Sequence, residues 1–228
     1  MSVLLRTLVV LVLVMTSASG AMAVPAFWTD WTTETAGAPG VLGSLTVGSS
    51  TVDVAFSGSY FFAQTSGGTN FWSPGAPYIS STVDNAPPAS DIIALGSGGL
   101  ATITFSEPVE DPLLALVSWN GNVVDFGVPI EILSFGCGFF GCGTPLLNAG
   151  STGFTGAGEV HGVIRLPGAF SSISFTHTSE FWHGLTVGVL GLAEPPPPPP
   201  TGVPAPASLV LLGLGLAGLA AARRRKQR

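Results

Sequence analysis

Apolar and polar residues alternate along four segments in the central part of the chain. In each segment an apolar side chain occupies every second position, with small or polar residues between; the segments are residues 50–56, 101–105, 171–177 and 185–189. Because successive side chains of a β-strand point to opposite faces of a sheet, this period predicts strands with one buried face and one face rich in hydroxyl groups.

An Asn-Gly pair separates two apolar runs, LLALVSW and VVDFGV. This pair favours the tight turn of a β-hairpin, so the sequence predicts a hairpin centred on Asn120 and Gly121. Residues 24–194 show no helical period with capping residues, and their apolar runs are short and divided by glycine, proline and serine. The fold predicted for residues 24–194 is all-β, a β-sandwich with a jelly-roll-like arrangement.

Residues 1–23 have the pattern of a secretory signal peptide. Arg6 supplies the positive charge, residues 8–15 form a short apolar core, and Ala21 and Ala23 are the small residues of a cleavage site after Ala23. This predicts transport by the secretion translocon and cleavage by signal peptidase. The alternative is an N-terminal anchor that is not cleaved.

The C-terminal part begins with six consecutive prolines, which predict an extended spacer over residues 195–202. Residues 207–222 carry no charge. As a helix they would be ~24 Å long, and snorkelling of flanking basic side chains would let them cross a bilayer core of about 30 Å. The basic residues that follow predict a single transmembrane helix with a cytoplasmic C-terminus; they are Arg223, Arg224, Arg225 and Lys226.

The C-terminal 26 residues, 203–228, resemble the PEP-CTERM sorting signal of bacterial proteins handled by an exosortase. A short proline motif precedes a Gly/Leu-rich helix and an arginine cluster; the motif residues here are Val203, Pro204, Ala205 and Pro206. Ala205 replaces the glutamate usual in that family. The prolines still keep the segment before the helix extended.

This resemblance implies sorting by a membrane-embedded, exosortase-like enzyme. The tail would be removed, and the body of an inner-membrane-anchored precursor would be released or attached at the surface of a Gram-negative-type bacterium. Family members are typical of bacteria that make extracellular polysaccharide. Tails of this type also occur on some ice-binding proteins.

Charge is distributed unevenly along the chain. All thirteen acidic residues lie between Asp30 and Glu194, where Arg165 is the one basic residue, so this segment has a formal charge of −12. Nucleic-acid binding is dominated by phosphate contacts from basic residues. The charge therefore excludes a nucleic-acid partner.

The two cysteines, Cys137 and Cys142, lie in the segment GCGFFGCG. In an oxidising compartment outside the cytoplasm this spacing predicts a small disulfide loop, and the flanking glycines permit the tight turn. Two free thiols or a metal site are the alternatives.

Two clusters could hold a metal ion. Glu107, Glu110 and Asp111 offer oxygen ligands for Ca²⁺ at the end of a predicted strand, and His177 and His183 lie on either side of Glu180. The sequence has no Asp-x-Asp-x-Asp-Gly loop, so solvated surface residues are the simpler interpretation of both clusters.

Five tryptophans suggest aromatic platforms for sugar rings, although tryptophans of a sandwich more often lie in the core; they are Trp28, Trp31, Trp72, Trp119 and Trp182. No Gly-x-Ser-x-Gly elbow is present, and we expect no enzymatic activity and no cofactor. The predicted function is that of an exported cell-surface or extracellular-matrix protein, with extracellular polysaccharide as a candidate partner. The alternatives are a carbohydrate-binding module, a secreted hydrolase, and a permanently anchored protein without sorting.

Overall fold

The computed structural model describes residues 22–37 and 40–193, and Arg223. The chain divides into two compact units after Ala193, and the second unit, Glu194–Arg228, lies almost wholly outside the described residues. The described elements are β1 (Phe27–Trp28), β2 (Asp30–Glu34), β3 (Val41–Val47), β4 (Ser50–Ser57), β5 (Phe62–Gln64), η1 (Ala76–Tyr78), β6 (Ile92–Leu95), β7 (Gly99–Glu110), β8 (Leu113–Trp119), β9 (Val123–Asp125), β10 (Glu131–Gly136), β11 (Gly143–Leu147), β12 (Gly153–Gly158), β13 (Val160–Arg165), β14 (Ala169–His177), β15 (His183–Val189) and β16 (Gly191–Leu192).

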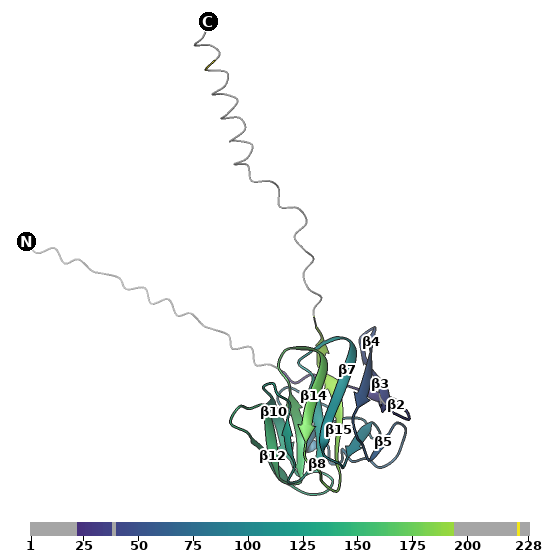
Figure 1. The fold of residues 1–228 in the computed structure, drawn as a ribbon, viewed down its shortest axis with the longest axis vertical. Coiled ribbons are helices and arrows are strands. Elements are labelled where there is room, and N and C mark those ends of the chain that lie inside the picture. The colour runs from purple at the N-terminus through teal and green to yellow at the C-terminus, as the bar shows by residue number, and fades with distance from the viewer. Residues whose placement is uncertain (1–21, 38–39, 194–222, 224–228) are drawn as a thin grey trace, which may run out of the picture. The chain divides into compact units, whose positions relative to one another are not determined.

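The strands form two antiparallel sheets packed as a sandwich (Figure 1). Sheet 1 has the order β10-β13-β8-β15-β6-β5, with β1 also paired to β15. Sheet 2 has the order β11-β12-β9-β14-β7-β4-β3-β2, with β16 also paired to β7. The all-β prediction is therefore confirmed.

The connectivity of strands β7 to β14 is that of a jelly roll. Strand β7 pairs with β14, β8 with β13, and β9 with β12. The pairs are therefore nested around one turning point, the loop between β10 and β11. The outgoing strands alternate between the two sheets, as expected when a long hairpin is wound into a sandwich. Strand β11 departs from the pattern, because it pairs with β12 in sheet 2 rather than joining β10 in sheet 1.

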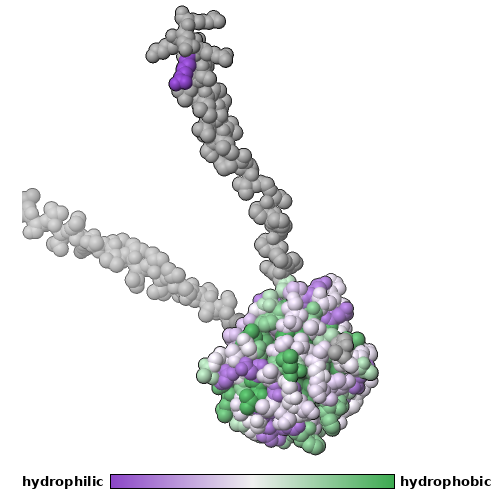
Figure 2. Space-filling model, viewed as in Figure 1, coloured by the Kyte–Doolittle hydropathy of each residue, from purple (hydrophilic) through white to green (hydrophobic). Residues whose placement is uncertain are grey.

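The alternating segments occupy the predicted faces in sheet 2. Val52, Val54 and Phe56 of β4 are buried in the core between the sheets. The alternating apolar positions of the two neighbouring strands are buried as well, namely Ala101, Ile103 and Phe105 of β7 and Ile173 and Phe175 of β14. The intervening hydroxyl side chains, such as Thr104 and Ser174, face solvent. In Figure 2 the pale colours of weakly polar residues cover much of the face in view, interrupted by green hydrophobic patches.

The predicted hairpin at Asn120 and Gly121 is wrong. Strand β8 before this pair belongs to sheet 1, whereas β9 after it belongs to sheet 2, so the pair crosses between the sheets. The side chain of Asn122 fixes this crossing because its Nδ2 donates to the carbonyl of Thr178 at 3.0 Å inside the sandwich. The local turn signal is real, since Gly121 has φ of 71°, but it turns the chain into the other sheet.

Strands β8 and β15 are buried on both faces, so the one-sided burial expected for residues 185–189 is incomplete. A second apolar cluster, which Trp72, Tyr78 and Val83 share with residues of the sheet 1 strands β6, β8 and β13, provides the additional burial. These three residues come from the long connection between β5 and β6. That connection therefore forms a third layer outside sheet 1.

The N-terminal segment is attached to the domain from Val24 onward. The Val24 amide donates to the carbonyl of Thr82 at 3.0 Å, and the amide of Asp84 donates to the carbonyl of Val24 at 3.1 Å. Ala26 is similarly bound, since its amide donates to Oδ1 of Asn85 at 2.6 Å. The first residue after the predicted signal cleavage is thus already part of the folded domain.

Candidate functional site

Four of the five tryptophans are core residues. Trp31, Trp72 and Trp119 are at most 2% exposed, and Trp28 is buried as well. None of these four rings can stack on a ligand from solution. Trp182, in the connection between β14 and β15, is half-buried and is the remaining candidate among the described tryptophans.

Trp182 lies within a continuous group of aromatic rings at the surface. Its ring centroid is 5.0 Å from that of Phe71 and 5.1 Å from that of Phe140. The neighbouring rings are arranged edge to face, except for the tilted pair Phe62–Phe71 and the stacked pair Phe71–Phe140. The group, called here the aromatic surface, comprises Phe61, Phe62, Phe71, Phe139, Phe140 and Trp182. Exposed apolar groups of this kind mark sites of interaction with ligands or partners.

The aromatic surface is assembled from four separate parts of the chain. Phe61 and Phe62 lie at the start of β5, Phe71 in the connection to β6, and Phe139 and Phe140 between β10 and β11. Phe61 is 64% exposed, and Phe139 and Phe140 are each 44% exposed. The predictions from sequence missed these phenylalanines, although the adjacent pair between two cysteines was visible.

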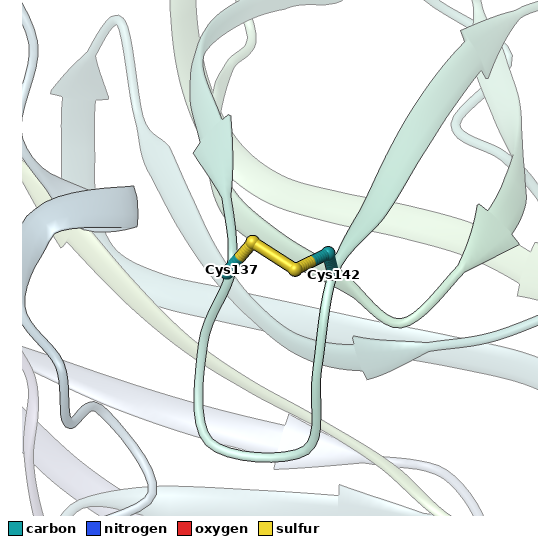
Figure 3. Close-up of a disulfide and its surroundings, with 2 residues drawn as sticks. All are labelled: Cys137 and Cys142. Atoms are coloured by element: carbon teal, nitrogen blue, oxygen red, sulfur yellow. A yellow bond between two sulfur atoms is a disulfide. The ribbon is translucent and has the colours of Figure 1, made fainter.

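A disulfide joins Cys137 to Cys142 across the base of the loop that carries Phe139 and Phe140 (Figure 3). Inside the loop the Gly138 amide donates to the carbonyl of Gly141 at 2.8 Å. Gly138 also allows the loop to lie directly on a buried ring, since a Cβ there would be 2.3 Å from Cγ of His161. This loop is the turning point of the jelly roll.

Replacing both cysteines by serine is expected to lower the free energy of unfolding by about 2 kcal/mol, the chain-entropy value for so short a loop. The measurement is a urea titration of the oxidised protein, with the reduced protein as the matched control. The double variant and the reduced protein should unfold at the same lower urea concentration. Coincident midpoints for the oxidised protein and the variant would contradict this prediction.

Three polar side chains lie together where β8 ends, and they are called here the carboxylate rim. Asn120 links two carboxylates: its Nδ2 donates to Oε1 of Glu159 at 2.7 Å, and its amide donates to Oε2 of Glu180 at 3.2 Å. Ser118 also donates to the carboxylate of Glu159. The rim consists of Asn120, Glu159 and Glu180.

The carboxylate rim borders the aromatic surface at two points. The amide of Glu159 donates to the carbonyl of Cys142 at 3.0 Å, and a Cβ on Gly141 would lie 3.4 Å from Cγ of Glu159. Glu159 therefore lies against the disulfide loop at Gly141, the residue that follows Phe140. At the other point Glu180 lines a surface pocket together with Phe61, and it precedes Trp182 by two residues in the same connection.

Glu180 also begins a chain of buried polar contacts into the sandwich. The interpretation of His177 and His183 as solvated surface residues is wrong, since they are 6% and 0% exposed. The Oε2 of Glu180 is 3.4 Å from Nδ1 of His183, and Nε2 of His183 is 3.1 Å from Nδ1 of His177. Burial raises the pKa of Glu180 to about 7, helped by the charge of Glu159. Burial and the neighbouring His177 lower the pKa of His183 to about 3. His183 is therefore neutral at pH 7, and its contact with Glu180 is not an ion pair.

The other metal candidates are separated by the fold. Glu107 and Glu110 are exposed on β7, whereas the Oδ1 of Asp111 accepts the amide of Gly168 at 2.7 Å and its Oδ2 lies 3.7 Å from Arg165. Asp111 thus holds the turn after β7. Within the described ranges, no group of three or more His, Cys, Asp or Glu side chains has the geometry of a metal site.

The predicted sorting residues lie outside the described residues, apart from Arg223, which is exposed. These are the motif Val203 to Pro206 and the basic residues Arg224, Arg225 and Lys226. Ala21 also lies outside, while Ala23 is described and half-buried. Among the described residues no helix is long and apolar enough to cross a membrane, and the helix expected at residues 207–222 is outside them.

Comparison with protein families identifies one feature of this chain. The family model of the PEP-CTERM protein-sorting motif matches residues 202–226. The resemblance of the tail to this sorting signal is therefore confirmed. No curated protein and no solved structure matches the chain.

Proposed function

We propose that the β-sandwich domain acts outside the cytoplasm as a component of the cell surface or extracellular matrix. The observation that carries this proposal is the PEP-CTERM motif at residues 202–226, which implies an exported, membrane-anchored precursor processed by an exosortase. The disulfide supports it, because such bonds persist in oxidising compartments outside the cytoplasm. Translocon, signal peptidase and exosortase are then the successive partners of the precursor.

The proposed role is binding rather than catalysis. The strongest candidates for acid–base chemistry, Glu159 and Glu180, are held by hydrogen bonds from Asn120, and Ser118 also donates to Glu159. These contacts fix the carboxylates as positioned acceptors at the edge of an apolar surface. Such an arrangement suits recognition of a ligand.

Intact mass spectrometry of the protein from its native host tests the sorting proposal. We expect a mature form that begins at Val24 and ends near the motif Val203 to Pro206, with any added mass identifying the attached group. A protein that extends from Val24 to Arg228 and is found in the inner membrane alone would instead indicate a permanent anchor.

A second candidate function is carbohydrate binding by the displayed domain. It is favoured by the aromatic surface, since exposed rings offer flat apolar faces for sugar rings. The test is co-sedimentation of the purified protein with insoluble polysaccharides. A protein that stays in the supernatant with every polysaccharide would remove this candidate and leave the sorting proposal intact.

A further inference from the structure

The rings of the aromatic surface hold one another in place before any ligand arrives. Phe140 contacts both Trp182 and Phe71, and the disulfide closes the loop that carries it. Phe62, Phe71, Phe139, Phe140 and Trp182 each contact at least one ring from another segment of the chain. Such prior ordering lowers the entropy lost on binding, which favours a real binding surface over a collection of exposed side chains.

The carboxylate rim adds hydrogen-bond acceptors at the edge of these rings. An ionised carboxylate has about four acceptor positions, and the contacts from Asn120 and Ser118 occupy some of those on Glu159. The remaining positions are suited to hydroxyl donors of a ligand. Apolar rings with adjacent acceptors are the complement of a sugar, which has apolar C–H faces and a border of hydroxyl groups.

Charge narrows the class of sugar. The chain segment from Asp30 to Glu194 contains thirteen acidic residues and one basic residue, Arg165. Arg165 already forms ion pairs with Glu131 and Asp111. An acidic polysaccharide would be repelled by this domain and by the carboxylate rim. An apolar protein partner would bury Glu159 and Glu180 without new donors, which is costly for polar groups.

We propose that the aromatic surface and the carboxylate rim together form one binding site for a neutral polysaccharide. This inference rests on the second candidate function and deepens it by assigning the site and the class of sugar. Phe140 and Trp182, whose rings meet edge to face at 82°, provide its apolar contacts. Glu159 and Glu180 accept hydrogen bonds from sugar hydroxyls at its edge.

The experiment measures binding of the mature protein to cellulose and curdlan, which are neutral, and to alginate, which is acidic. We expect binding to at least one neutral polymer and at least tenfold weaker binding to alginate. Phe140→Ala and Trp182→Ala should each weaken binding at least tenfold. Phe135→Ala is the matched control, since Phe135 is 50% exposed on β10 and lies outside the aromatic surface.

Glu180→Gln tests the rim with an almost isosteric change and, at pH 8 where the Glu180 carboxyl is ionised because its pKa is about 7, should weaken binding to the neutral polymer about fivefold. Thermal unfolding of each variant separates loss of the site from loss of the fold. Equal binding to alginate, or unchanged binding by folded Phe140→Ala, would overturn the inference while leaving carbohydrate binding in place. Absence of binding to all three polymers would overturn both.

Discussion

Replacing Trp119 with alanine is expected to lower the free energy of unfolding by about 4 kcal/mol, as for other fully buried aromatic side chains. The ring is 0% exposed at the end of β8 and lies 4.3 Å from the ring of His183, centroid to centroid. Its Nε1 donates to the carbonyl of Gly184 at 2.9 Å in the core. Alanine would leave a cavity between the sheets and remove this buried hydrogen bond.

Urea denaturation followed by circular dichroism measures this loss. Trp119→Phe is the control that keeps a large ring and removes the donor, and a smaller loss of about 1–2 kcal/mol is expected for it. Phe135→Ala on the surface should change stability by less than about 0.5 kcal/mol. A loss below about 1 kcal/mol for Trp119→Ala would contradict the packing described for this end of β8.

The two faces of the sheet 2 strands could be predicted from the sequence because the period of two is a local property. Val52, Val54 and Phe56 are buried, and their alternation alone predicts this without knowledge of the neighbouring strands. The hairpin at Asn120 and Gly121 failed for the opposite reason. The pairing partners of β8 are β13 and β15, which lie far away in sequence and occupy both of its sides. A hairpin between β8 and β9 is therefore not formed.

The candidate site shows the same division between local and tertiary information. The short cysteine spacing is local, and the two phenylalanines between Cys137 and Cys142 can be read from the sequence. Their contact with Phe71 and Trp182 arises only when three chain segments meet. The sorting motif, in contrast, is a linear signal, so residues 202–226 were identifiable without any fold.

Acidification provides the second large expected effect, through a buried histidine at the turning point of the jelly roll. His161 is 0% exposed, and its Nδ1 lies 3.3 Å from the hydroxyl of Tyr78. No partner for its Nε2 is found among the described atoms. Burial lowers the pKa of His161 to about 4, against an opposing effect of Glu159.

The direction of the effect of pH on stability follows from comparing the pKa of His161 in the folded and unfolded chains. Below pH 6.5 the unfolded chain protonates His161, while the folded protein resists until about pH 4. The stability due to the neutral ring is therefore complete above pH 6.5 and is lost as the pH falls towards 4. A shift of this size corresponds to about 3 kcal/mol.

Other groups titrate over the same range, so the effect must be measured as a difference between variants. His177 and His183 also have lowered pKa values and add to the loss in acid. Glu180 opposes them, because its raised pKa stabilises the fold at low pH and that stability is lost as the pH rises through about 7.

Between pH 7 and pH 4 the wild-type protein should lose about 3 kcal/mol more stability than His161→Phe, because phenylalanine fills the site without taking up a proton. The measurement is the free energy of unfolding from urea titrations at several pH values in that range. The contributions of Glu180, His177 and His183 are present in both proteins and cancel in the comparison. Parallel curves for the two proteins would mean that His161 is protonated without cost, and hence that water reaches its Nε2 beneath the disulfide loop.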